Sequence, residues 1–423
     1  MEPEPLADPE HELLSRYGSP IYVYRLERVT AALKHLRAML PEPASILFSV
    51  KANPHPDVAR ALSSSGCGAE VSSMGELAAA LDAGFDAGSC LYTGPAKSAT
   101  EIAAALAAGV RRFSAESVTD LARIGAVAVD NATTAECLIR VNAMARGATG
   151  IRMTGTPSQF GVTADELMHD SSAFRDTPGV RIVGLHFFPV SNVGGEASLC
   201  REFEESIRLT AMLKSNAGLP VDFVSLGGGF ASPYAQPGDR PSYPALRAHL
   251  TRALDEWLPG WRAGEPTIGF ESGRYLVGEC GTLLTTVMDV KSRDDRVFVL
   301  LDSGINHLGG LSGIGRMLPA AVATRIDPGR STPRGHDPAQ EAAWTGNRST
   351  LVGPLCTPAD VLGNQIVTGP CRAGDVVAIS NVGAYGLTAS LLSFLSRPAP
   401  TEVVLQDNLI VSASNLRYHR VPS

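Results

Sequence analysis

The chain has 423 residues, of which 44% are hydrophobic and 19% are charged, a composition typical of a globular protein with a sizeable core. Its formal net charge is −7, with 36 basic against 43 acidic residues and no basic run, which argues against a nucleic-acid partner. The seven cysteines form no CxxC pair, so neither a disulfide framework nor a zinc site is expected.

The N-terminal stretch MEPEPLADPEHELLSRYGSP is acidic and lacks the apolar segment of a signal peptide. We find no run of about eighteen apolar residues that could span a membrane. We therefore expect a soluble, cytoplasmic protein without a membrane partner.

Eight short apolar segments recur in the first two thirds of the chain, and each ends in small or polar residues. They lie at 45–53, 68–73, 90–95, 111–117, 136–142, 181–188, 222–229 and 267–274. Between them, apolar residues recur at helical spacing, and patterns such as HPDVARALSSSG and MGELAAALDAG stop at glycine. Eight strands that alternate with helices predict an α/β fold, the (β/α)8 TIM barrel.

After Arg274 the pattern becomes β-rich, in RVFVLLDSG, DVVAISNVGAYG and TEVVLQDNLIVSAS, without regular helices between the segments. We expect a barrel over 30–275 and a mainly β domain over 276–423, to which residues 1–29 lend a strand through PIYVYRLERV. The polar, turn-rich stretch 325–349 is expected to be a loop or locally disordered. The sequence leaves open whether this stretch is an ordered lid.

Barrel enzymes carry their chemistry at the C-terminal ends of the strands, so the last residues of each segment are candidate functional residues. They form a ring of ionisable groups and glycines: Lys51, Glu70, Lys97, Glu116, Arg140, His186, Gly227–Gly229 and Glu271–Arg274. A solvated charge at a strand end is common, so the set carries more weight than any single member.

The GGGF and ESGR sequences follow the seventh and eighth strands, where TIM barrels frequently bind phosphate. Glycine lets backbone N–H groups approach phosphate oxygens, and Arg274 adds a planar donor fork. A triple glycine alone would be read as a flexible turn, but the neighbouring arginine favours a phosphate site.

Two further strand-end residues suggest which phosphate compound binds. Lys51 can form a Schiff base with an aldehyde, and Glu271 can pair with a pyridinium nitrogen. An amine, an acid and a phosphate cradle together match pyridoxal 5′-phosphate (PLP). His186 would either stack on the ring or be a buried histidine bonded to the backbone, and the sequence favours neither.

Eight motifs resemble, in order along the chain, those of the fold-type III PLP-dependent decarboxylases, the family of the diaminopimelate, ornithine and arginine decarboxylases. They are SVKAN with Lys51, GAEVSSMGEL, SQFG at 158–161, His186, GGGF, ESGR, GPLCTPAD with Cys356, and VGAYG. The resemblance covers about residues 20–398. It implies a PLP-binding barrel followed by a mainly β domain, the alanine racemase-like two-domain architecture, in a head-to-tail homodimer with shared active sites.

The resemblance also implies roles by position. Lys51 would carry the Schiff base, His186 would stack on the ring and Glu271 would bind the pyridine nitrogen. Cys356 would enter from the partner subunit and protonate the carbanion left by loss of CO2. Racemases that share the barrel use a tyrosine as second base, so a thiol favours decarboxylation. The residues expected to hold the phosphate are Ser191, Gly228, Gly229, Gly273, Arg274 and Tyr385.

The chain departs from the family pattern at the residues that contact the far end of the substrate. Thr357 follows Cys356 where the diaminopimelate enzymes have a glutamate for the distal amine and the ornithine type has an aspartate. INHLGGLSGI places Gly310 and Ile314 where the diaminopimelate enzymes have the Arg and Tyr that grip the distal carboxylate. Free diaminopimelate, ornithine and lysine are therefore expected to be poor substrates. The residues expected to contact the true substrate are Arg274, Cys356 and Thr357.

The motifs HFFPVSN, INHLGG and GPLCTP resemble a branch that contains the butirosin-type decarboxylase of glutamyl groups on an acyl-carrier protein. This favours decarboxylation of a carrier-tethered or otherwise derivatised amino acid in a natural-product or polysaccharide-type biosynthetic pathway. The carrier would have to be joined through a side-chain carboxyl, because the α-carboxylate must be free. One alternative is a decarboxylase of a free amino acid. Another is a non-catalytic PLP-fold regulator, against which intact Lys51, Glu271 and Cys356 argue.

Overall fold

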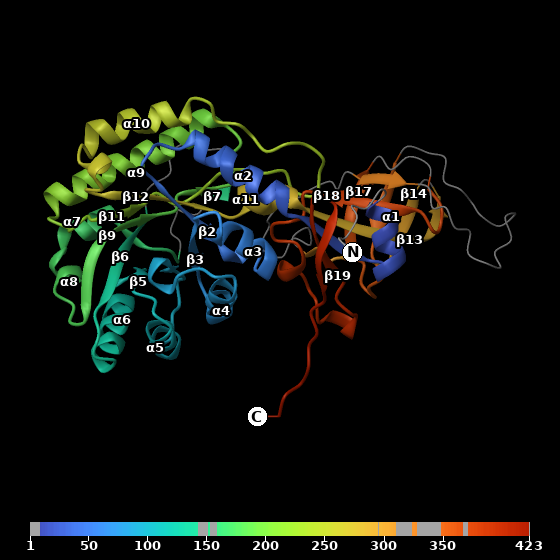
Figure 1. The fold of residues 1–423 in the computed structure, drawn as a ribbon, viewed down its shortest axis with the longest axis horizontal. Helices are drawn as coiled ribbons and strands as arrows, with labels where there is room; N and C mark the ends of the chain where they lie inside the picture. Colours follow the sequence, from blue (N-terminus) through green and yellow to red (C-terminus); the bar gives the residue numbers. More distant parts are fainter. Residues whose placement is uncertain are drawn as a thin grey trace, which may run out of the picture. The chain divides into compact units, whose positions relative to one another are not determined.

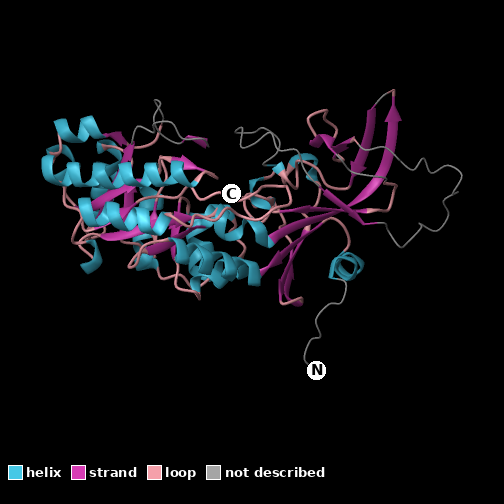
Figure 2. Cartoon of the chain, turned by 90° about the horizontal axis from the view of Figure 1, so that it is seen from above, coloured by secondary structure: helices cyan, strands magenta, loops and turns pink. Residues whose placement is uncertain are grey.

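The computed structural model describes residues 9–142, 151–152, 159–294, 296–309, 324–327, 348–366 and 371–422. The chain divides into two compact units, a barrel unit in which helices surround the strands and a β unit dominated by strands (Figure 1, Figure 2). The barrel unit comprises Thr30–Ala231 and Pro241–Leu276. The β unit comprises Met1–Val29, Ser232–Arg240 and Val277–Ser423, so a short piece from within the range 30–275 groups with it. None of the helices in the described parts is long and apolar enough to cross a membrane.

Eight parallel strands form the closed barrel predicted from the sequence, in the predicted order. They are β2 (Ser45–Ser49), β3 (Gly68–Val71), β4 (Leu91–Tyr92), β5 (Arg112–Ala115), β6 (Ala135–Asn142), β9 (Val180–Phe187), β11 (Phe223–Ser225) and β12 (Thr267–Ser272). The ring closes where β12 pairs with β2, with Glu271 in register with Leu47. The carboxyl ends of the first and last strands are therefore neighbours.

Helices connect these strands on the outside of the barrel, and α9 and α10 lie side by side (Figure 1). They are α2 (Leu26–Met39), α3 (Pro56–Ser63), α4 (Met74–Asp82), α5 (Ala99–Ala107), α6 (Val118–Asp130), α7 (Ala164–His169), α8 (Ser172–Arg175), α9 (Glu196–Asn216), α10 (Leu246–Trp257) and α11 (Arg274–Val277). Serine hydroxyls start several of them: Ser73 accepts the amide hydrogen of Glu76, and Ser98 that of Glu101.

Apolar side chains fill the barrel interior below its polar residues. Five strands contribute one residue each to this cluster: Leu47, Leu91, Leu138, Val183 and Phe223. Side chains two positions apart on a strand share a face, so Arg140 and Ser225 lie above Leu138 and Phe223 on the same side of the barrel wall. The polar residues at the carboxyl ends thus stand on a close-packed base.

The strands of the β unit form one mixed sheet. They are β1 (Ile21–Arg25), β13 (Gly281–Arg293), β14 (Arg296–Leu301), β15 (Thr324–Asp327), β16 (Ser349–Val352), β17 (Val361–Ile366), β18 (Val376–Ser380), β19 (Thr401–Gln406) and β20 (Leu409–Ser414). Strand β1, formed by PIYVYRLERV, lies between β13, to which it is antiparallel, and β19, to which it is parallel. Helix α1 (Pro9–Tyr17) packs on this sheet through Leu13.

The polar stretch 325–349 is not a loop throughout. Its first residues belong to β15, which pairs with β18, and its last residue begins β16. A β-branched pair, Thr324 and Ile326, suits an extended strand despite the polar context. Residues 328–347 lie outside the described part, as do Gly310 and Ile314.

A buried tyrosine–carboxyl pair lies in the middle of the β sheet. Tyr24 on β1 donates a hydrogen bond of 2.9 Å to Glu402 Oε1 on the neighbouring β19, and Glu402 is only 5% exposed. Burial raises the pKa of Glu402 to about 7, against the lowering effect of the Tyr24 hydroxyl. A carboxyl group at this point is therefore protonated more readily in the folded chain than in the unfolded one.

This pair predicts a pH dependence of stability. An unfolded glutamate has a pKa of about 4.3, so between about pH 4.3 and 7 the folded state keeps a proton that the unfolded state has lost. The free energy of unfolding should then fall with rising pH across this window by up to about 4 kcal/mol. Glu402→Gln should remove that fall, as measured by denaturant titrations at pH 4.5, 6 and 7.5.

The matched comparison is Tyr24→Phe, which keeps the ring and removes the hydroxyl that stabilises the carboxylate. It should extend the pH-dependent fall to higher pH. A wild-type protein whose pH slope equals that of Glu402→Gln would show that this carboxyl group does not titrate in the expected range.

Candidate active site

Lys51 lies in a single 3₁₀ turn directly after β2, and its amine is held by a buried carboxylate. Lys51 Nζ is 2.8 Å and 3.0 Å from the two carboxylate oxygens of Glu70 on β3, and Thr93 Oγ1 donates to Glu70 Oε1 at 2.5 Å. Burial raises the pKa of Glu70, but the charge of Lys51 and hydrogen bonds from Lys51, Thr93 and Ser49 outweigh it and lower the pKa to about 2. The Lys51 side chain stays 37% exposed. The amine is thus fixed by an ionised partner and remains accessible.

A buried histidine on β9 and a buried carboxylate on β12, the strand next to β2, lie at the same end of the barrel. His186 Nδ1 is 2.7 Å from Ser114 Oγ, while Nε2 is 3.0 Å from Glu271 Oε1 in an orientation that makes no hydrogen bond. Ser225 Oγ donates to Glu271 Oε1 at 2.5 Å. Both His186 and Glu271 are only 1% exposed. Because Glu271 is desolvated and already fixed by Ser225, it is suited to accept a hydrogen bond from the ring nitrogen of a bound heterocycle.

Glycines are required where the ends of β11, β12 and β2 converge. Gly227 has φ +73°, and a Cβ on Gly228 would lie 2.6 Å from the carbonyl oxygen of Glu271. A Cβ on Gly273 would lie 2.7 Å from that of Ala52, next to Lys51. Arg274 follows at the start of α11 and is buried. These turns bring backbone close to backbone, which is the arrangement that a phosphate cradle needs.

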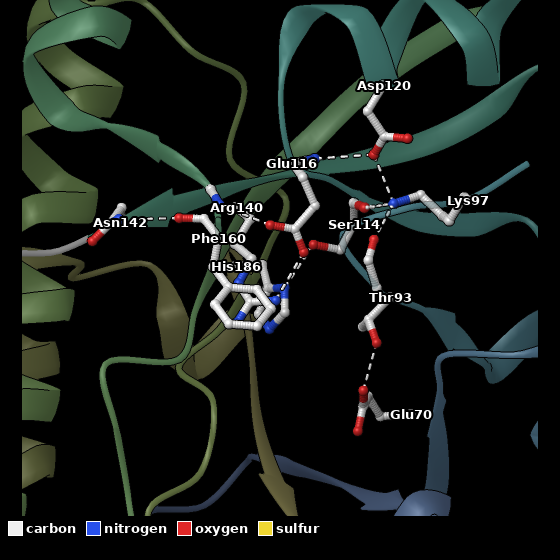
Figure 3. A network of polar contacts seen from close by, with 12 residues as sticks. Glu70, Thr93, Lys97, Ser114, Glu116, Asp120, Arg140, Asn142, Phe160 and His186 are labelled. Carbon is white, nitrogen blue, oxygen red and sulfur yellow. Dashed lines mark hydrogen bonds and ion pairs between the residues drawn. The ribbon is translucent and has the colours of Figure 1, made fainter. Parts of the chain in front are cut away.

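A buried polar network supports the same end of the barrel (Figure 3). Lys97 Nζ lies 2.6 Å from Asp120 Oδ2 and donates to the carbonyl oxygen of Ser114 at 2.9 Å. The Glu116 amide donates to Asp120, and the Glu116 carboxylate pairs with Arg140 at 2.8 Å. Three of the expected strand-end candidates, Lys97, Glu116 and Arg140, are therefore tied up in buried ion pairs. Lys97 also lies five residues beyond β4 and not at its end.

The network also anchors part of the SQFG motif. The guanidinium of Arg140 lies 4.6 Å from the ring centroid of Phe160, and the Gly161 amide donates to Glu116 Oε2 at 2.7 Å. Asn142 Nδ2 donates to the Phe160 carbonyl at 3.0 Å (Figure 3). Ser158 lies outside the described residues. The motif thus serves to attach the segment after β6 to the wall of the barrel.

The remaining candidates lie on other elements. Ser191 is in β10 (Val190–Ser191), which pairs with β7 (Ile151–Arg152). Tyr385, in the β unit, has φ +54°, an unusual conformation for a non-glycine residue, and its carbonyl accepts a hydrogen bond from Tyr234. Cys356 and Thr357 are also in the β unit. Cys356 is exposed, whereas the other six cysteines are buried. The Thr357 hydroxyl accepts the amide hydrogen of Ala359, so this side chain shapes its own turn.

Sequence reasoning missed the hydroxyl groups that orient the charged residues. Thr93 holds Glu70, Ser114 holds His186 and Ser225 holds Glu271. A signal for two of them was present, because RRFSAES and DFVSLGGG each place a serine inside an otherwise apolar strand. A polar side chain facing a packed barrel needs a partner, and a charged residue at a neighbouring strand end is the natural one.

Comparisons with known proteins bear on this geometry. Residues 26–278 match the family model described as the pyridoxal binding domain of the pyridoxal-dependent decarboxylases, which is more than half of the chain. The chain belongs to the pyridoxal-dependent decarboxylase family. It is accordingly a PLP-dependent decarboxylase of fold type III, with PLP as its cofactor.

Curated relatives of this decarboxylase differ in substrate. The chain is 31% identical to the L-glutamyl-[BtrI acyl-carrier protein] decarboxylase of Niallia circulans, over 93% of this chain and 90% of that protein. It is 28% identical to the 2-[(L-alanin-3-ylcarbamoyl)methyl]-2-hydroxybutanedioate decarboxylase of Staphylococcus aureus, over 95% and 98%. It is also 28% identical to the diaminopimelate decarboxylase of Zymomonas mobilis, over 95% and 90%.

Solved structures share the fold of this decarboxylase. The diaminopimelate decarboxylase of Helicobacter pylori, complexed with L-lysine, aligns with a TM-score of 0.79 at 24% identity, over 96% of this chain and 95% of that one. The lysine decarboxylase of Selenomonas ruminantium aligns with a TM-score of 0.75 at 23% identity, over 95% and 97%. The barrel and the β sheet thus form the architecture of fold-type III decarboxylases.

The glycine turn after β11 provides a test of the cofactor cradle. Gly228→Ala would place its Cβ against the Glu271 carbonyl, a backbone atom that cannot rotate away. Overpacking of this kind costs about 1–3 kcal/mol, so we expect PLP affinity to fall about ten- to hundredfold. Equilibrium titration of the apoprotein with PLP measures the change.

Gly75→Ala in α4 is the control, since the nearest atom to its new Cβ is Ser73 Oγ at 3.8 Å. It should leave PLP affinity unchanged and stabilise the helix slightly. Equal PLP affinity of the two variants would argue against a cradle at Gly228.

Proposed function

We propose that this decarboxylase acts on an amino acid whose side-chain end carries no free ammonium group, with a γ-linked glutamyl thioester on a carrier protein as the favoured substrate. The observation that carries the proposal is the chemistry of the loop around Cys356. Between Gly353 and Asp360 the one acidic residue is Asp360, which is 2% exposed and accepts two backbone amide hydrogens. This loop offers no accessible carboxylate to a distal ammonium, and leaving such a charge unpaired in a closed site costs several kcal/mol.

The names of two relatives support this reading. One acts on an L-glutamyl group carried by an acyl-carrier protein. The other acts on a compound in which alanine is joined through its third carbon to a carbamoyl group. The second name places an amide linkage at the end of the amino-acid side chain, and the first joins the amino acid to a carrier protein. Diaminopimelate decarboxylases match at a similar identity, so a free amino acid is the alternative substrate.

The proposed roles of the barrel residues follow from their positions. When bound, PLP supplies the electron sink for the carbon that loses CO2. Lys51, held by Glu70, would bind its aldehyde carbon, and Glu271, held by Ser225, would accept a hydrogen bond from its ring nitrogen. His186 would lie against the ring. The residues proposed for the phosphate are Ser191, Gly228, Gly229, Gly273, Arg274 and Tyr385.

Cys356 is proposed as the proton donor of the reaction. Its thiol would deliver a proton to Cα after CO2 has left, because a thiol can both give and recover a proton near neutral pH. We propose that it serves the site of a partner subunit in a homodimer. A racemase would instead need a second base that removes the α-proton.

Lys51→Ala tests the cofactor attachment. The variant has no amine for the Schiff base, so its visible absorbance should be lost and bound PLP should wash out on dialysis. Absorbance spectra and PLP content by mass spectrometry measure both effects. Lys34→Ala, at an exposed site on α2, should retain absorbance and PLP. A Lys51→Ala protein with an intact Schiff-base spectrum would place the attachment at another lysine.

A substrate comparison tests the specificity proposal. The purified enzyme is offered a γ-L-glutamyl carrier-protein thioester beside free L-glutamate, L-ornithine, L-lysine, L-arginine and meso-diaminopimelate. We expect kcat/KM for the thioester to exceed that for the dibasic amino acids by about 100-fold or more, the cost of leaving one buried ammonium unpaired. Release of CO2 is followed by mass spectrometry. Efficient turnover of ornithine or diaminopimelate would refute the specificity argument, and loss of CO2 from none of the compounds would favour a regulatory protein.

A further inference from the structure

Asp360 is a buried carboxylate that the reaction does not use, and it lies in the loop that carries Cys356. It is 2% exposed, although it follows directly on the exposed residues Pro358 and Ala359. Its two oxygens are used separately. Oδ2 accepts the amide hydrogen of Leu355 at 2.7 Å, and Oδ1 accepts that of Ile305 at 2.8 Å. One carboxylate therefore ties together two loops that are about fifty residues apart in the sequence.

The main chain of Asp360 closes the same loop. Its carbonyl oxygen accepts the amide hydrogen of Gly353 at 3.0 Å, and its own amide donates to the carbonyl of Thr357 at 3.2 Å. The Thr357 amide donates to the carbonyl of Leu355 at 2.8 Å. Residues 353–360 are thus folded into a compact turn around Asp360, with Cys356 on its exposed side.

The packing around the carboxylate is as close as the hydrogen bonding. A Cβ on Gly304 would lie 2.2 Å from Asp360 Oδ1, and a Cβ on Gly353 would lie 2.3 Å from Oδ2. The two glycines come from the two loops that Asp360 joins. A side chain at either glycine would therefore displace the carboxylate from the two backbone amides whose hydrogens it accepts.

We propose that Asp360 is a positioning residue for Cys356: it holds the Cys356 loop against the 302–306 loop so that the thiol is presented at a fixed point. The proposal rests on the proton-donor role proposed for Cys356. Leu355, whose amide hydrogen Asp360 accepts, directly precedes Cys356. Holding that amide therefore restricts the backbone that carries the thiol. Misplacement of a reacting group by about 1 Å can cost about a hundredfold in rate, so a fixed loop matters to a proton transfer.

Asp360→Asn is the sharpest variant, because it keeps the shape and replaces one acceptor oxygen by an NH2 group. That group would face either the Leu355 or the Ile305 amide, donor against donor. Gly353→Ala disturbs the same carboxylate by placing a methyl group against Asp360 Oδ2, without replacing Asp360 itself. The control is Asp375→Asn, which alters another buried carboxylate of the β unit that accepts a backbone amide hydrogen, that of Arg372 at 2.9 Å.

The first measurement is made on the purified protein and needs no substrate. Hydrogen exchange of peptides containing Leu355 and Ile305 should quicken about tenfold or more in Asp360→Asn and Gly353→Ala, and not in Asp375→Asn. The rate of Cys356 with 5,5′-dithiobis(2-nitrobenzoate) should move toward that of the synthetic peptide GPLCTPADVL. Cys356 is the exposed cysteine of the chain, so the fast reaction reports on it. A wild-type rate equal to that of the peptide, or unchanged exchange in both variants, would overturn the proposal.

The second measurement separates positioning from general damage. It uses the γ-L-glutamyl carrier thioester, or the free amino acid that outperforms it in the comparison above. With the proton delivered to Cα, each CO2 is matched by one amine. If the proton goes instead to the cofactor carbon, water releases the decarboxylated chain as an aldehyde and the nitrogen stays on the cofactor. Asp360→Asn should lower the ratio of amine to CO2 and lower kcat about tenfold, with KM nearly unchanged.

Cys356→Ser is the reference that separates the two proposals. If it keeps a ratio of one, the proton-donor role of Cys356 is wrong, and the exchange and thiol rates alone decide whether Asp360 orders the loop. If Cys356→Ser lowers the ratio while Asp360→Asn and Gly353→Ala leave it at one, the positioning role of Asp360 is wrong and the role of Cys356 stands.

Discussion

The closure of the barrel is the constraint on which the site depends. Only when β12 pairs with β2 do the last and first strands of the ring become neighbours, with Glu271 in register with Leu47 and Lys51 just beyond β2. Residues 220 positions apart in the chain are thereby held by backbone hydrogen bonds and not by side-chain contacts. The pairing of the strands then fixes the spacing of the polar residues at their carboxyl ends. This explains how a site whose residues each come from a different strand can be rigid.

Charged residues at this end of the barrel form ion pairs, both at Lys51 and in the network around Lys97 and Arg140. Lys97 with Asp120 and Arg140 with Glu116 are buried pairs that carry no free charge to the mouth of the barrel. The Lys51–Glu70 pair differs because the lysine stays partly exposed. Removing one partner of any of these pairs would destabilise the fold, because the other partner would remain as an isolated charge. The Lys51 amine is therefore accessible, whereas the ammonium group of Lys97 is buried.

Much of this arrangement was predictable from the sequence. The eight strands follow from apolar runs separated by helical spacing, and the carboxyl-end rule then places Lys51, His186 and Glu271 at one end of the barrel. The pattern could not show which charged strand-end residues face each other, so it placed Lys97, Glu116 and Arg140 in the same ring of candidates as Lys51 and did not reveal their buried ion pairs. Which side chains form ion pairs depends on the strand register and on the side-chain χ angles, and neither can be read from composition. The strand β15 was not predicted because four residues in a polar, turn-rich stretch give too short a pattern, although they pair with β18 in the sheet.

The position of β1 in its sheet has a consequence for how the molecule is made. Strand β1 precedes the barrel in the chain, whereas its two neighbours β13 and β19, and β20 beyond β19, follow the barrel. The barrel has all its strands once about 275 residues have been synthesised, but the sheet stays open until its last members arrive. During synthesis β1 therefore keeps both edges unpaired until the strands that follow the barrel are available. The barrel can thus be regarded as an insertion between two strands of the β unit, so the unit that carries the thiol is completed after the barrel.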